Sequence, residues 1–251
     1  MFADSIPCAF FAEMKELPNE HARLANFEFD VLRAADNYRR ALLREFAPHL
    51  RGKVIEVGAG IGQITELLRN LPDIQELVSI EPEAAFCDEF RKSFPGQRLI
   101  QGTIESLPDA HPVNAIISVN VLEHIRDDEH ELAAYGQLLR TEQGHLCLFV
   151  PARQEIYAPL DRDFGHHRRY AKAELKSKLE RAGFEVLRLN YFNWVGYFAW
   201  WLNFCVLKKP GFHAESVRFF DRAVFPGVYW LESRLCRPPF GQSLIAIARA
   251  K

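Results

Sequence analysis

The sequence predicts an α/β fold, in which a seven-stranded, mostly parallel sheet carries helices on both faces. An N-terminal helical segment and an aromatic helical insertion between the last two strands complete it. Three observations support this prediction. Apolar segments of strand type alternate with segments of helical periodicity. Several strand segments are apolar at successive positions, as in parallel strands buried on both faces. A Trp- and Phe-rich segment, residues 193–240, interrupts the alternation.

The length and charge of the chain restrict its classes of function. With 251 residues it can bury a sizeable core, and a net charge of −2 provides no global field that attracts nucleic acid. The longest apolar segments fall short of the ~18 consecutive residues of a spanning helix, and the N-terminus lacks the pattern of a secretory signal. Five widely spaced cysteines predict neither a zinc site nor a disulfide framework. We therefore expect a cytoplasmic protein that contacts membranes peripherally at most.

The expected elements follow one another along a single domain, residues 1–251. Residues 1–50 are predicted to form a helical cap, because apolar residues recur there at near-helical spacing until Pro48. Residues 51–192 form the cofactor-binding core, 193–240 a helical insertion or substrate lid, and 241–251 the last strand. Strands are expected at 53–58, 76–81, 98–102, 113–120, 144–151, 184–192 and 243–250. Helices are expected at 63–71, 83–94, 127–140 and 171–183.

A glycine loop follows the first expected strand in "VIEVGAGIGQ", residues 54–63. Gly58, Gly60 and Gly62 follow a G-x-G-x-G spacing, which leaves one residue fewer for wrapping a pyrophosphate than the dinucleotide fingerprint G-x-G-x-x-G. Glu56 precedes the loop, and Glu81 ends the next strand, where an acid can bind ribose hydroxyls. The pattern fits a ligand with a ribose and no pyrophosphate, and it disfavours a nicotinamide-dependent oxidoreductase. The alternative is a tight turn with a solvated acid.

Together with "QGTIESL", "SVNVLEHI" and "HLCLFVPA", this loop resembles the class I S-adenosylmethionine-dependent methyltransferases. The resemblance covers roughly residues 36–192 and the final strand, and it implies a Rossmann-like fold with S-adenosyl-L-methionine as cofactor. The residues that the resemblance assigns to cofactor binding are Tyr38, Glu56, Gly58, Gly60, Gly62, Glu81, Thr103, Ile104, Asn120 and Val121.

The resemblance also implies individual roles for some of these residues. Thr103 and Ile104 would lie near the adenine, although the family often has an Asp at the first of these positions. Asn120 and Val121 would line the methionine moiety. Tyr38 would cap the methionine carboxylate, and its alternative role is that of an aromatic residue in the core.

Methyl transfer from a sulfonium mainly requires alignment of the reacting atoms. A hydroxyl or amine acceptor also benefits from a base with a pKa near the working pH, which suits histidine. The candidates are His124 in "LEHI" and the adjacent His166 and His167 in "DRDFGHHRRY". We favour the adjacent pair, while His124 can equally be a helix-start residue bonded to backbone.

The loop "GHHRRY" also suggests a clamp for an anionic acceptor, and a similar segment occurs in a bacterial methyltransferase subgroup. Its alternative is a basic loop paired to Asp161 and Asp163. No acidic cluster has metal-ligand spacing, so no metal is expected. The substrate-binding candidates are Arg168, Arg169, Tyr170 and Trp194.

The insertion contains all four tryptophans of the chain. In a structural role it is a helical hairpin that packs on the core or forms a dimer seam. In a functional role it is a lid over the substrate or a membrane-facing surface, and Lys208 and Lys209 suit an interfacial position. We expect methyl transfer to a small, amphiphilic or anionic acceptor, with O-methylation of a sugar, lipid-linked or phenolic hydroxyl. N- or C-methylation and a non-catalytic adenosylmethionine-binding partner protein are the alternatives. The chain is expected to be a monomer or homodimer.

Overall fold

The computed structural model describes residues 33–107, 112–211, 213–235 and 237–251. The helical prediction for residues 1–32 lies outside this part of the chain. The predicted helix that follows is confirmed as α2 (Asp36–Phe46), which buries Leu42 and Phe46. Its backbone N–H groups at Asn37 and Tyr38 donate to Asp221 of the insertion at 3.0 and 2.9 Å. These bonds satisfy N–H groups that the first turn of a helix leaves without intrahelical partners.

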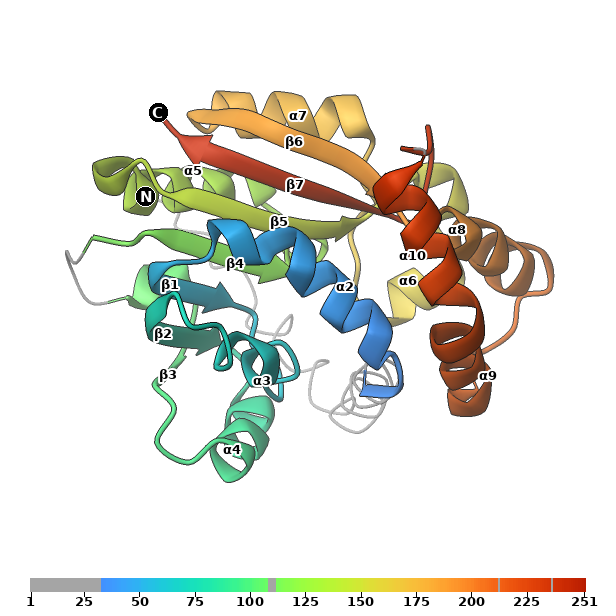
Figure 1. Cartoon of the computed structure of the whole chain (residues 1–251), viewed down its shortest axis with the longest axis horizontal. Coiled ribbons are helices and arrows are strands. Elements are labelled where there is room, and N and C mark those ends of the chain that lie inside the picture. Colours follow the sequence, from blue (N-terminus) through green and yellow to red (C-terminus); the bar gives the residue numbers. More distant parts are fainter. Residues whose placement is uncertain (1–32, 108–111, 212, 236) are drawn as a thin grey trace, which may run out of the picture.

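Seven strands form one sheet in the order β3-β2-β1-β4-β5-β7-β6 (Figure 1). β7 runs antiparallel to both of its neighbours, and the other strand pairs are parallel. The predicted mostly parallel α/β fold is therefore confirmed. The strands are β1 (Gly52–Val57), β2 (Ile74–Glu81), β3 (Leu99–Gln101), β4 (Ala115–Val119), β5 (His145–Pro151), β6 (Phe184–Phe192) and β7 (Ser243–Ala250).

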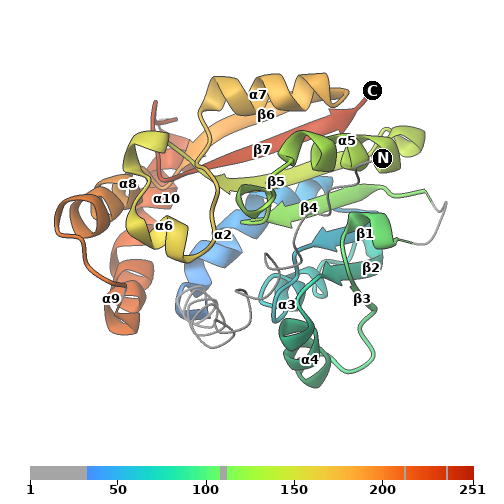
Figure 2. The same ribbon diagram turned by 180° about the vertical axis from the view of Figure 1, so that it is seen from behind.

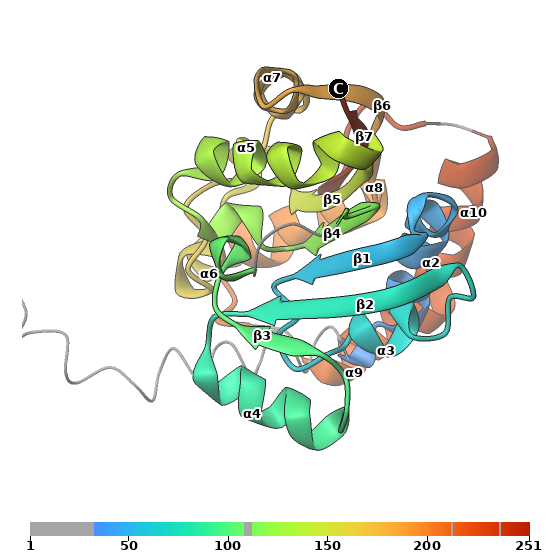
Figure 3. The same ribbon diagram turned by 90° about the vertical axis from the view of Figure 1, so that its left-hand side faces the viewer.

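Helices cover both faces of this sheet, which is why the central strands are apolar at successive positions. In β4, Ile116 packs in a core cluster with residues of α5 (Asp128–Leu139) and α7 (Lys172–Arg181). Its neighbour Ile117 packs in a second cluster with residues of α2. Figure 3 shows α5 and α7 on one side of the sheet and α2 on the other. α4 (Ala84–Ser93) lies near β2 and β3.

Two helical elements differ from the sequence predictions. The helix expected at 63–71 is reduced to α3 (Thr65–Leu68). Leu71 precedes Pro72, and a residue before proline disfavours helical backbone, which limits any extension. A short helix that was not expected, α6 (Pro159–Asp163), follows β5. It begins with a proline at its first position, where the missing N–H carries no cost.

The insertion between β6 and β7 is helical, as expected. It consists of α8 (Trp194–Trp200), the π-helix η7 (Trp201–Val206), α9 (Ala214–Phe219), the π-helix η8 (Phe220–Val224) and α10 (Phe225–Arg234). These helices lie at the end of the sheet toward which β5 points (Figure 1), and α8 lies close to α6 when the molecule is seen from behind (Figure 2). The insertion therefore borders the carboxyl edge of the parallel strands.

Candidate active site

The glycine loop follows β1 with a backbone that ordinary residues rarely adopt. Gly58, Gly60 and Gly62 have φ values of 71°, 54° and 92°. A Cβ atom on Gly58 would lie 2.2 Å from Cγ2 of Val121, in the segment after β4. The first glycine is thus required both by its left-handed backbone and by close packing against a neighbouring loop.

Glu81 lies at the carboxyl end of β2 and turns its carboxylate toward this loop. Oε2 accepts a hydrogen bond from the Gly60 N–H at 2.8 Å, and Oε1 accepts one from the Glu83 N–H at 2.9 Å. Burial raises the pKa of Glu81. An ionised carboxylate has roughly four acceptor positions, so the two backbone bonds leave acceptor capacity for a vicinal diol. The donor and acceptor set fits a ribose.

Glu56 lies beneath the loop on β1 and is buried. Its Oε2 accepts hydrogen bonds from the hydroxyls of Thr65 at 2.6 Å and Ser79 at 2.8 Å. Burial raises the pKa of Glu56 to about 7, although these two hydrogen bonds oppose the shift. The carboxyl group therefore joins β1, β2 and α3 under the glycine loop.

Tyr38 lies in a cluster of aromatic side chains. Its ring centroid is 5.1 Å from that of Phe192, 4.9 Å from that of Phe225 and 6.1 Å from that of Phe149. Burial raises the pKa of its phenol. This placement agrees with the alternative of an aromatic residue in the core, and the capping role of the partly buried side chain stays a prediction.

The remaining cofactor candidates lie after β3 and β4. Thr103 is exposed, and Ile104 is buried in the core at the start of the 3-10 turn η3 (Ile104–Ser106). Asn120 directly follows β4 with a φ of 53°, and its N–H donates to the carbonyl of Phe149 at 2.9 Å. Left-handed backbone at a residue other than glycine is uncommon, and such residues cluster at functional sites.

The structure brings His124 and His166 together and leaves His167 exposed. Their ring centroids are 4.7 Å apart, with the rings nearly perpendicular. His124 belongs to the 3-10 turn η4 (Leu122–His124) after β4, and His166 follows α6. Burial, together with the neighbouring His166 and His167, lowers the pKa of His124 to about 3. Of the predicted adjacent pair, only His166 therefore faces another candidate base.

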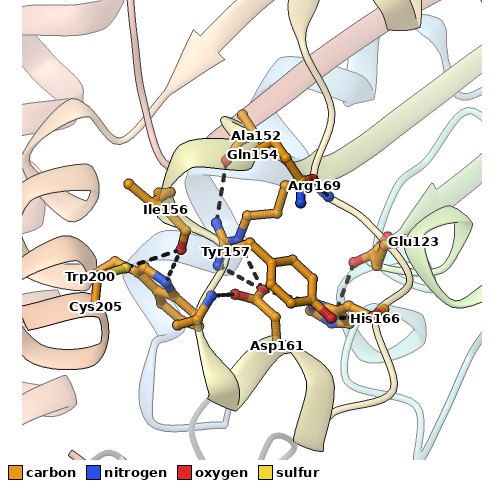
Figure 4. A network of polar contacts seen from close by, with 11 residues as sticks. Glu123, Ala152, Gln154, Ile156, Tyr157, Asp161, His166, Arg169, Trp200 and Cys205 are labelled. Carbon is orange, nitrogen blue, oxygen red and sulfur yellow. Dashed lines mark hydrogen bonds and ion pairs between the residues drawn. The ribbon is translucent and has the colours of Figure 1, made fainter. Parts of the chain in front are cut away.

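Two buried carboxylates flank His166 (Figure 4). Its Nδ1 lies 3.0 Å from Oδ1 of Asp161, and its Nε2 lies 3.9 Å from Oε1 of Glu123. From the sequence, Asp161 is expected only as an alternative partner of the basic loop, and Glu123 has no predicted role. The available signal for Glu123 was its place directly before His124 in "LEHI".

Asp161 also holds the guanidinium of Arg169. Nε and Nη2 of Arg169 lie 2.9 and 2.8 Å from Oδ1, and the Ala158 N–H donates to Oδ2 at 2.8 Å. The guanidinium carbon lies 4.3 Å from the ring centroid of Trp200 in the insertion. Burial alone would raise the pKa of Asp161, but the hydrogen bond from His166 and the Arg169 charge hold it below the ordinary value.

These contacts disfavour the predicted clamp for an anionic acceptor at the buried Arg169 and Tyr170, and the clamp role of the partly exposed Arg168 stays a prediction. The Arg169 side chain is 2% exposed and is satisfied by Asp161. Nη1 of Arg168 lies 2.9 Å from Asp128, and the Tyr170 hydroxyl donates to the same carboxylate at 2.7 Å. All three side chains therefore use their polar groups within the protein. The alternative of an acid-paired loop describes Arg169.

Trp194, the fourth substrate-binding candidate, begins α8 at the border of the site. Its backbone N–H donates to Glu232 at 2.6 Å, and its ring meets that of Phe198 edge-on with centroids 6.3 Å apart. The indole is half-buried. Its role toward an acceptor stays a prediction.

Comparison with known proteins places this geometry in context. A family model described as a methyltransferase domain matches residues 29–189. An uncharacterised methyltransferase of Oceanobacillus iheyensis is 30% identical over 93 residues, which are 37% of this chain and 43% of that relative. The matched segment thus spans less than half the length of this relative.

Two solved structures share the fold. One is the methyltransferase in the complex with the Trm112 methyltransferase activator of Haloferax volcanii, with a TM-score of 0.60, 14% identity, and coverage of 92% of this chain and 97% of that chain. The other is an S-adenosylmethionine-dependent methyltransferase of Mesorhizobium loti, with a TM-score of 0.55, 13% identity, and coverage of 82% and 95%. At these identities the similarity concerns the architecture.

Proposed function

Since this chain belongs to the methyltransferase domain family, whose model spans residues 29–189, we propose that it methylates a hydroxyl group of a small-molecule acceptor with S-adenosylmethionine as donor. One observation carries the proposal. The ribose-type site at Glu81 and the histidine cluster at His124 and His166 both follow carboxyl ends of parallel strands in the same sheet. Ligands of open α/β sheets bind at this edge.

The donor site consists of the glycine loop and Glu81. The close approach of the loop backbone and the acceptor capacity of the Glu81 carboxylate fit the nucleoside part of the donor. Val121 packs against the same loop from the β4 side, and Asn120 directly precedes it. When bound, S-adenosylmethionine supplies a methyl group that its sulfonium already activates.

The acceptor lies beside His124 and His166 in this proposal. A hydroxyl nucleophile must lose its proton during transfer, and a positioned base typically contributes 10²–10⁴-fold. His166 suits this task because Asp161 accepts from Nδ1, which directs the lone pair of Nε2 away from Asp161. His167 is exposed, and its backbone N–H donates to the Glu123 carbonyl at 2.8 Å.

Glu81→Ala is expected to weaken binding of S-adenosylmethionine and of its demethylated product by about 1–3 kcal/mol, because charge-assisted hydrogen bonds to the ribose are lost. Titration calorimetry measures this directly. Glu89→Ala is the matched control, since Glu89 is an exposed acid on α4 that pairs with Lys92. Binding of NAD without binding of adenosylmethionine would contradict the proposed donor.

The insertion supports an amphiphilic acceptor or one presented at a membrane surface. Trp200 and Phe204 pack toward the active-site loop with Ile156, whereas Trp201 and Leu202 are 45% and 47% exposed. Further exposed apolar side chains of this segment are Phe198, Val206 and Leu207. Lys208 and Lys209 follow directly and suit anionic headgroups. Among the helices of the described chain, none has the length and apolar character needed to cross a bilayer.

Vesicles containing phosphatidylglycerol are expected to carry the protein upward in a flotation gradient. Replacing Trp201 and Leu202 together by Glu is expected to reduce the bound fraction at least tenfold, since each large apolar side chain contributes ~1.5–3 kcal/mol when it leaves water. Leu187→Glu is the control, because Leu187 is 43% exposed but lies on β6. Equal flotation of the double variant and the wild type would exclude this face.

A further inference from the structure

We propose that Glu123, His124 and His166 bind a divalent transition-metal ion. One ligand atom from each of these residues lies within 4.8 Å of the other two. Sequence spacing concealed this cluster, because His166 lies 42 positions after His124. The fold brings them together by placing η4 after β4 and the loop after α6 at the same edge of the sheet.

The orientation of His166 is the second observation. The Asp161 carboxylate accepts a hydrogen bond from Nδ1 at 3.0 Å, so the other ring nitrogen, Nε2, carries the lone pair. Histidines that bind metals usually donate their second ring N–H to a carboxylate or carbonyl in this way. Nε2 faces Oε1 of Glu123 at 3.9 Å, which is beyond hydrogen-bond distance and near the separation of two ligands around one ion. Metal–ligand distances of ~2.0–2.2 Å would require Nε2 of His166 and Oε1 of Glu123 to move only slightly closer together.

The charges of the surrounding groups favour a cation. Arg169 neutralises Asp161 through two contacts of 2.8 and 2.9 Å. Glu123 is buried beside the imidazoles of His124 and His166. Arg168 is held by Asp128, and His167 is exposed. A divalent ion bound by the three residues would be attracted by the Glu123 carboxylate without displacing either arginine.

The ligand types indicate the class of metal. Two imidazole nitrogens and one carboxylate oxygen suit Zn²⁺, Fe²⁺, Co²⁺ or Mn²⁺ better than Mg²⁺ or Ca²⁺, which prefer oxygen ligands alone. Three protein ligands leave a coordination position open. This next step rests on the proposed function: with an ion bound, Nε2 of His166 would serve as a ligand instead of as the base, and an acceptor hydroxyl at the open position would bind through its oxygen and lose its proton to solvent more readily.

Full-length protein stripped with a chelator and titrated with Co²⁺ provides the test. We expect one equivalent to bind with visible absorption bands of a low-symmetry site, and Zn²⁺ to displace it. His166→Ala and Glu123→Gln are expected to lower the affinity at least tenfold, and Asp161→Asn to lower it 10–100-fold. His167→Ala is the matched control and is expected to bind as the wild type does. Circular dichroism of each variant identifies any that fail to fold.

Absence of Co²⁺ binding, or binding that His166→Ala and Glu123→Gln leave unchanged while both remain folded, would overturn the metal site. Calorimetry with S-adenosylmethionine on the same samples separates the two proposals. If the wild type binds Co²⁺ but does not bind S-adenosylmethionine, the proposed function is refuted and the metal site stands. Normal donor binding without Co²⁺ binding would refute the metal site alone.

Discussion

Asp161→Ala is expected to lower the free energy of unfolding by about 3–5 kcal/mol, the usual effect of removing one partner of a buried ion pair. Asp161 is completely buried and accepts from the side chains of His166 and Arg169 and from the Ala158 N–H. Its loss leaves the Arg169 guanidinium buried without a carboxylate. The stacked Trp200 and its helix α8 are expected to loosen with it.

Urea denaturation of the variant at neutral pH measures the effect as a shift in midpoint at constant slope. Asp163→Ala, at the last residue of the short helix α6, is the control with an expected change within ~0.5 kcal/mol. The pKa of Asp161 lies below its ordinary value of 3.8, so its contribution exists above that value and is lost as pH falls through the folded pKa. The difference from wild type should therefore shrink in acid. A difference below ~1 kcal/mol at neutral pH would contradict the structural assignment.

Gly58→Ala is expected to cost about 2–5 kcal/mol of stability and to abolish donor binding. The left-handed backbone, with a φ of 71°, costs a residue with a side chain roughly 1–2 kcal/mol. The new Cβ would lie 2.2 Å from Val121, and such overpacking costs typically 1–3 kcal/mol more. To relieve this clash the glycine loop must move, and with it the Gly60 N–H that donates a hydrogen bond to Glu81.

Gly96→Ala separates these two contributions. Gly96 has a similar φ of 82°, but nothing lies within 4 Å of an added Cβ. We expect it to lose only the conformational part and to bind adenosylmethionine normally. Combining Gly58→Ala with Val121→Ala is expected to recover part of the stability. Equal destabilisation by Gly58→Ala and Gly96→Ala would show that the packing against Val121 has no energetic consequence.

The sequence alone determined the sheet and the positions of the glycine loop and Glu81 at its edge. The strand segments 184–192 and 243–250 coincide with β6 and β7 because their apolar residues and flanking turns are local signals. The glycine loop and Glu81 were predictable for the same reason, since each depends on its position at the end of one strand. The length of helix α3 was overestimated, because the helical periodicity continues toward Pro72, where helical backbone is disfavoured.

The contacts of the basic loop "GHHRRY" were decided by the tertiary structure. Local pattern showed two arginines and two histidines beside acids, and it could not tell which charges meet. The fold turns Arg169 inward to Asp161, leaves His167 at the surface and places His166 against His124 and Glu123. Which side chains meet depends on which strands end side by side. β4 and β5 pair directly in the sheet, although the segment between them in the sequence includes the helix α5. Periodicity reports the burial of a residue, whereas its partner is set by this long-range pairing.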